Sequence, residues 1–127
     1  MITLIIPPVA VGRQTRRVPH NMQNQRMHWA ARNRWNVAWR EAVGWEWTRN
    51  KEKPSPLPLK FAKIQVVLSV MKLFDKDGSY SAVKPILDGL TAVGAIIDDS
   101  PQYIDLEVVQ NKSYHRKDEG VKIYINY

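Results

Sequence analysis

Three tryptophans and a valine recur at every fourth position within a long stretch that contains no proline. They are Trp35, Trp39, Val43 and Trp47, and the stretch runs from Gln25 to Arg49. Apolar residues at this spacing share one face of an α-helix, and buried indole rings remove a large area from water. The pattern predicts one long helix over 25–49, with Asn24 as its N-cap. Its apolar face must be covered by another layer of structure.

The remaining segments predict that layer to be a β-sheet. Strands are expected over 1–6, about 59–74, about 104–112 and 121–127, because apolar and polar residues alternate there or turn-forming residues bound the segment. A second helix is expected from about Ser81 to Val93, with Pro85 early in it and Gly94 as its stop. Residues 9–22 show no clear period and are expected to form a loop. The order β, α, β, α, β, β predicts a single small α+β domain over 1–127, with a mixed, mainly antiparallel sheet packed against two main helices.

Composition excludes several classes of protein. The chain is 44% hydrophobic and 24% charged, as expected for a globular protein, and no apolar run approaches the roughly 20 residues of a membrane helix. It has no cysteine, which excludes disulfides, cysteine-bound zinc and thiol nucleophiles. The first residues lack the pattern of a signal peptide. We therefore expect a cytoplasmic location and no membrane partner.

The net charge of +7 belongs entirely to the first half of the chain. Up to residue 53 there are ten basic residues, eight of them arginine, against three acidic ones, whereas the rest of the chain has nine of each. Arginine suits bidentate contacts with phosphate, so DNA is the expected partner; the alternative is a solvated basic face that keeps the protein soluble. The candidate DNA-binding residues in this half are Arg13, Arg16, Arg17, Arg26, His28, Arg32, Arg34 and Arg40, and those in the second half are Lys72 and Lys76.

Five aspartates in the second half carry the candidate chemistry: Asp75, Asp77, Asp88, Asp98 and Asp99. If the chain is still extended after the third strand, Asp75 and Asp77 point to the same side and can share a cation. Lys84 lies four residues before Asp88 and so shares its helix face. Oxygen ligands of this kind favour Mg²⁺, with Mn²⁺ as the alternative, and no small-molecule cofactor is expected. Taken singly, each group has a plainer explanation, a turn at 75–78 or 98–101 and a surface ion pair at Lys84 and Asp88.

The order and spacing of these groups resemble the core signature of the RusA family of Holliday junction resolvases. The resemblance lies in residues 75–78 (DKDG), 84–90 (KPILDGL) and 94–100 (GAIIDDS), with a further similarity at 24–29 (NQRMHW). The family pattern is an Asp-x-Asp-Asn turn, a helix with a lysine followed by Asp-Gly-Leu, and a Gly-x-x-x-Asp-Asp loop. The similarity covers about residues 24–49 and 73–112.

The resemblance implies a homodimeric, Mg²⁺-dependent endodeoxyribonuclease of RusA-like fold that binds four-way DNA junctions and cuts two strands symmetrically, in DNA recombination and repair. By position, Asp75, Asp77 and Asp99 are the implied catalytic and metal-binding carboxylates, with Asp98 as a further metal ligand. Asp88 is a supporting carboxylate. Lys84 is the implied catalytic cation near the scissile phosphate.

Two departures leave alternatives open. Gly78 stands where the family has asparagine, and Phe74 stands where an arginine precedes the first aspartate. The chain could therefore be a catalytically weakened junction-binding protein of the same fold. A third interpretation is a metal-dependent nuclease of other branched or single-stranded DNA, because the carboxylates do not themselves select the substrate.

Overall fold

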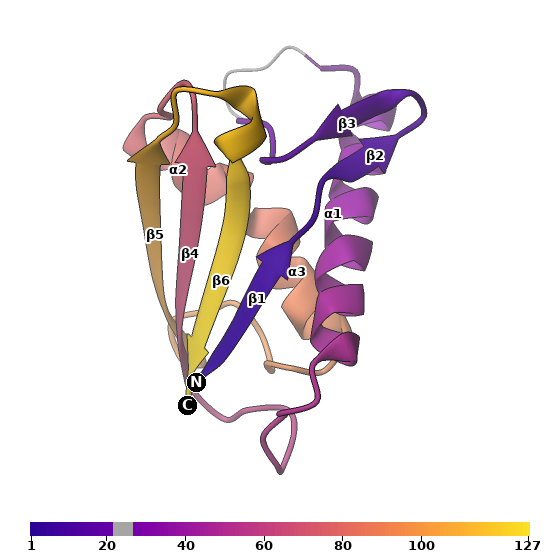
Figure 1. The fold of residues 1–127 in the computed structure, drawn as a ribbon. Coiled ribbons are helices and arrows are strands. Elements are labelled where there is room, and N and C mark those ends of the chain that lie inside the picture. The colour runs from indigo at the N-terminus through magenta and orange to yellow at the C-terminus, as the bar shows by residue number, and fades with distance from the viewer. Residues whose placement is uncertain (22–26) are drawn as a thin grey trace.

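One mixed sheet and two packed helices form the body of the molecule (Figure 1). The computed structural model describes residues 1–21 and 27–127. The sheet contains strands β1 (Ile2–Ile6), β4 (Ala62–Val70), β5 (Ile104–Lys112) and β6 (Gly120–Asn126). Its order is β1-β6-β4-β5, and only the β4–β5 pair is parallel. The predicted α+β architecture with a mixed sheet and two main helices is confirmed.

The helices lie on one side of this sheet. The long helix α1 (Trp29–Arg49) and the shorter α3 (Lys84–Ala92) pack against each other (Figure 1). A short helix α2 (Lys76–Ala82) comes directly before α3, so both helices belong to the crossover that joins the parallel strands β4 and β5. A small hairpin of β2 (Val9–Val11) and β3 (Gln14–Arg16) follows β1, and a 3₁₀ turn, η1 (Arg116–Asp118), precedes β6.

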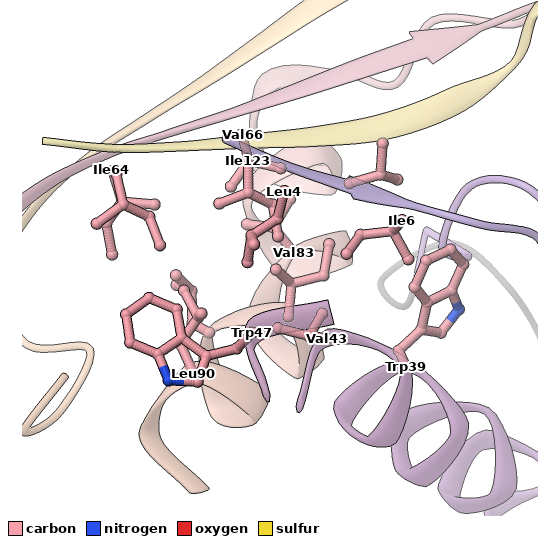
Figure 2. Packing of buried hydrophobic residues seen from close by; sticks show 14 of the residues in the cluster. Leu4, Ile6, Trp39, Val43, Trp47, Ile64, Val66, Val83, Leu90 and Ile123 are labelled. Atoms are coloured by element: carbon pink, nitrogen blue, oxygen red, sulfur yellow. The ribbon is translucent and has the colours of Figure 1, made fainter. Parts of the chain in front are cut away.

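The tryptophan stripe faces the sheet, as its spacing predicts. Trp39 and Val43 have no exposed surface, and Trp47 is also buried. Opposite them, the apolar residues of β4 are buried at every second position, among them Ile64 and Val66 (Figure 2). This alternation fixes which face of β4 meets the helices, because successive side chains of a strand point to opposite faces.

The long helix begins later than the sequence predicts. Met27 and His28 are not helical, and the imidazole Nδ1 of His28 accepts a hydrogen bond from the Ala30 amide at 3.2 Å, which caps the first turn of α1. A histidine can satisfy an orphan amide here as asparagine or aspartate usually does. Asn24, the predicted N-cap, lies outside the described residues.

The second predicted helix corresponds to α3, and a separate short helix, α2, precedes it. Residues 75–78 form neither an extended strand end nor a simple turn: Asp75 is the N-cap of α2, and its Oδ1 accepts a hydrogen bond from the Gly78 amide at 2.6 Å. The helix is interrupted at Val83. Pro85 lies in the first turn of α3 and has no backbone amide that could continue the hydrogen bonding of α2. Gly94 follows the end of α3 with a φ of 78°, as a helix stop requires.

Two other boundaries differ from the prediction. The expected loop at 9–22 contains the β2–β3 hairpin, whose three-residue strands are too short to show a period. Strand β4 ends at Val70 and not at Phe74, because residues 71–74 leave the sheet and bond to side chains of β5 and of the loop before β6. Among the described residues, no helix has both the length and the apolar composition needed to cross a bilayer.

Candidate functional site

Asp75 and Asp77 stand at the start of α2. Because this segment is helical, the two carboxylates do not share one side as they would on a strand. The Asp75 side chain caps the helix, so one of its oxygens is already engaged by the Gly78 amide. Asp77 is exposed in the first turn. A negative charge is stabilised at this end of a helix by the peptide dipoles.

Lys84 joins two of the other aspartates. Its ammonium lies 3.2 Å from Oδ1 of Asp88, one turn further along α3, and also contacts Oδ2 of Asp99 in the loop before β5. The hydrogen bond from Lys84 is the main cause that lowers the pKa of Asp99, and neighbouring Asp98 lowers it further. The same contact with Asp99 raises the pKa of Lys84. The fold thus brings Lys84, Asp88 and Asp99 together, as the motif predicts, with Asp98 exposed beside them.

The arrangement does not by itself provide a metal site. Within the described part of the chain, no group of three or more histidine, aspartate or glutamate side chains is placed so that it could hold a metal ion. A hard cation with protein ligands needs carboxylate oxygens directed at one point. Here the ammonium of Lys84 takes the position of the cation next to Asp99.

Replacing Lys84 with methionine is expected to raise the pKa of Asp99, because the ammonium that stabilises its charged form is removed. Carboxyl-carbon NMR titration in chelator-treated buffer measures this pKa. The ion pair stabilises the fold fully at pH values above the pKa that the Asp99 carboxyl has in the unfolded chain. This stabilisation is lost as the pH falls through the lowered pKa of Asp99 in the folded protein. Since Lys84 is 56% exposed, the change in the free energy of unfolding should stay below about 1 kcal/mol. Arg49→Met is the control, because it breaks the exposed Arg49–Glu46 pair and should leave the pKa of Asp99 unchanged. If the pKa of Asp99 does not rise in the Lys84 variant, the ion pair with Lys84 is contradicted.

A hollow of about 430 Å³ opens beside Asp75. It is bounded by the connection between β4 and α2 and by residues that follow the β2–β3 hairpin. Arg16 and Lys72, two of the predicted DNA-binding residues, lie in its wall together with Asp75 and Glu119. A basic residue of the first half therefore lines the same hollow as the first aspartate of the motif.

A second hollow, of about 380 Å³, lies between α1 and the helix pair α2–α3. Arg32 and Asn36 line it from α1, and Lys84 and Asp88 line it from α3. Another predicted DNA-binding residue thus lies beside the motif residues. Each hollow combines at least one aspartate of the motif with an arginine of the first half.

The other candidate DNA-binding residues lie at the surface. His28 is exposed at the start of α1 next to Trp29, which is 75% exposed, so neither belongs to the core. Arg26 lies outside the described residues. The remaining residues are exposed on the hairpin and its edge, on α1, on the connection into α2 and at the first position of α2: Arg13, Arg17, Arg34, Arg40, Lys72 and Lys76.

The connection that carries Asp75 is held by side chains that the sequence did not single out. The carboxamide of Gln110 on β5 accepts a hydrogen bond from the Phe74 amide at 2.8 Å and donates one to the Phe74 carbonyl at 3.0 Å. Glu119 accepts a hydrogen bond from the Met71 amide at 3.1 Å. These contacts span 36 and 48 residues of sequence, so no local pattern reveals them. They fix the backbone immediately before Asp75, which makes Gln110 a positioning residue.

Gly78 has a steric reason to be glycine. A Cβ atom at this position would lie 2.5 Å from Nδ2 of Asn21 and 2.5 Å from Oδ1 of Asp75, closer than real atoms approach. The Asn21 carboxamide occupies the space above this turn of α2, beside the Asp75 carboxylate. An amide side chain is therefore present where the family pattern has asparagine at position 78, but it comes from residue 21.

Comparison of the chain with protein-family models, with curated proteins and with solved structures gives no match. The function proposed below rests on the residues and contacts described above.

Proposed function

We propose that the protein is a structure-selective endodeoxyribonuclease that binds four-way DNA junctions as a homodimer and resolves them by paired, symmetric cuts. The observation that carries this proposal is that first-half arginines line the same hollows as motif aspartates. Arg16 lines one hollow with Asp75, and Arg32 lines the other with Lys84 and Asp88. A nuclease needs cations that hold the phosphates next to the groups that attack one of them.

Within this proposal the residues divide by charge. Asp75, Asp77 and Asp99 act at the cleavage step, with Asp98 and Asp88 in support. Lys84 neutralises the charge that develops on the scissile phosphate, a task to which its ammonium, 56% exposed, has access. Mg²⁺, or Mn²⁺ in its place, belongs to the proposal as the implied cofactor. The homodimer belongs to it because two symmetric cuts suit an enzyme with a two-fold axis.

A cleavage assay on a synthetic four-way junction tests the proposal. Labelled junction, duplex and flap substrates are incubated with the protein, each with Mg²⁺, with Mn²⁺ and with chelator. We expect paired nicks at related positions of the junction, dependence on the metal, and little cutting of the duplex. Equal cutting of flap and junction would instead favour a nuclease of branched DNA in general. Sedimentation of the protein with and without junction gives the number of protomers bound.

The contact between Lys84 and Asp99 favours a second candidate, a junction-binding protein that does not cut. In that case the ammonium would hold the carboxylates permanently and metal would not enter. The same assay separates the two, because this candidate predicts tight junction binding in a gel-shift experiment with no product at any metal concentration.

Affinity for the junction is expected to fall steeply with salt. Each phosphate that an arginine or lysine neutralises releases condensed counterions, so about six contacts would weaken binding on the order of 10³-fold between about 50 and 200 mM salt. Fluorescence anisotropy over this range measures the slope. Charge reversal at Arg34 and Arg40, both exposed on α1, should flatten the slope, whereas reversal of Lys60, exposed before β4, is the control. An affinity that does not depend on salt would rule out the proposed DNA-binding face.

A further inference from the structure

Arg16 is unlike the other arginines of the hairpin region because it is half-buried. Its Nε donates a hydrogen bond to the Val18 carbonyl at 3.0 Å. Among the described residues, no carboxylate lies within ion-pair distance of its guanidinium, even though Glu119 is close enough to influence it. Burial lowers the pKa of Arg16, and the nearby Arg116 lowers it further. A guanidinium in this position is stabilised by an anion brought from outside.

The hollow that Arg16 lines has room for such an anion. Its volume is about 430 Å³, and its wall includes Lys72, Phe74 and Asp75. Glu119 also belongs to the wall, but its Oε2 already accepts the Met71 amide. The wall thus holds two cations, Arg16 and Lys72, and two carboxylates, of which Glu119 is engaged by the Met71 amide and Asp75 belongs to the proposed cleavage site.

We propose that this hollow binds a backbone phosphate of the DNA strand next to the bond that is cut, with Arg16 as its main donor. The inference rests on the proposed function for the identity of the strand. The planar guanidinium has several N–H donors in a fixed fork, which matches two phosphate oxygens at once. Because Asp75 borders the same hollow, a phosphate held there would fix the position of the neighbouring phosphodiester relative to the aspartates of α2.

The structure separates Arg16 from its neighbours in the sequence. Arg13 lies in the turn of the β2–β3 hairpin, and Arg17 directly follows Arg16, but both are exposed and neither lines the hollow. All three were equal candidates from composition. Only Arg16 is expected to recognise one particular phosphate, whereas Arg13 and Arg17 contribute general attraction.

The test combines protein variants with DNA junctions in which one phosphate has lost its charge. Junctions are made in which one methylphosphonate replaces one phosphate, scanned through the positions on both sides of the cut. For the wild-type protein, one position is expected to lower affinity about 10-fold, the loss typical of a charged hydrogen bond. The Arg16→Gln variant should bind the unmodified junction with an affinity lowered by a similar factor. Its affinity should not change further when the methylphosphonate is at that position. Arg13→Gln and Arg17→Gln should keep the wild-type sensitivity.

A smaller probe makes the outcome independent of junction cleavage. Thymidine 3′,5′-bisphosphate is titrated into the protein, and NMR shifts are followed at the Phe74 amide, which lines the hollow and is present in every variant. Saturable shifts in the wild type that vanish in Arg16→Gln support the phosphate site even if no junction is cut. Equal shifts in both proteins, or a methylphosphonate effect that persists in Arg16→Gln, overturn it while leaving the proposed nuclease function standing. Arg16→Lys, which keeps the charge but loses the fork, replaces Arg16→Gln if circular dichroism shows that the glutamine variant is unfolded.

Discussion

The Asp77→Asn variant is expected to lose at least about 100-fold of its cleavage rate at saturating junction while its affinity for the junction persists. Asp77 is exposed in the first turn of α2 and takes no part in the core, so the change removes a charge and leaves the shape intact. The stability lost with the charge at this helix start should be at most about 1 kcal/mol. Single-turnover cleavage and fluorescence anisotropy measure the rate and the affinity separately.

Asp105→Asn is the matched control for this prediction. Asp105 is an exposed aspartate of β5, and its neighbour Ile104 is buried in the core, so its side chain lies on the opposite face of the sheet from the helices. The same chemical change there should leave the rate unaltered. A rate in Asp77→Asn equal to that of the wild type would remove Asp77 from the site, and loss of binding together with cleavage would assign it to folding instead.

Introducing at position 78 the asparagine that the RusA family pattern has there is expected to damage the protein. In Gly78→Asn the new Cβ must displace the Asn21 carboxamide or the Asp75 carboxylate, each 2.5 Å from its position. Forcing extra atoms into an occupied space typically costs about 1–3 kcal/mol. We expect a loss of this size in the free energy of unfolding, measured with urea, and at least about a 10-fold fall in cleavage if Asp75 is the group that moves.

Two further variants separate crowding from other effects. Gly120→Asn introduces the same residue at a glycine where an added Cβ would meet no atom within 4 Å, so its effect should be small. In the double variant Asn21→Gly with Gly78→Asn, the side-chain amide comes from residue 78 and the crowding against residue 21 is relieved, while that against Asp75 remains. Stability and cleavage should recover relative to Gly78→Asn alone. If the single variant is as stable as the wild type and cuts faster, the space above α2 is not filled by Asn21 as described.

Local patterns predicted the body of the fold well. The four-residue spacing of the tryptophans and the alternation in β4 depend only on which face of each element meets the core, and both are confirmed. The limits of β5 were predicted to the residue. Helix α2 was missed because Asp77-Gly78 is also a common turn sequence, and the signal that mattered was Asp75 as an N-cap before a short helical run.

The site was less accessible to sequence reasoning because its contacts are long-range. The motif placed Lys84, Asp88 and Asp99 in one neighbourhood, and the ion pairs agree with that placement. It also predicted a convergence of Asp75, Asp77 and Asp99 on one cation, which no three-carboxylate group among the described residues provides. Nothing local distinguishes Arg16 from Arg13, since the hollow that Arg16 lines is formed largely by residues 70–75 and Glu119, which are distant in the sequence.

The parallel pairing of β4 with β5 has a consequence for how the site is acquired during folding. Parallel neighbours cannot be joined by a tight turn, so every aspartate of the motif resides in the crossover that links them. The segment can take its final shape only when β5 has docked, because Gln110 on that strand anchors the backbone before Asp75. Under the proposed nuclease function, partly folded molecules that lack this strand would therefore be unable to cut DNA. In a denaturant series, cleavage and the hydrogen-exchange protection of β5 amides should disappear together.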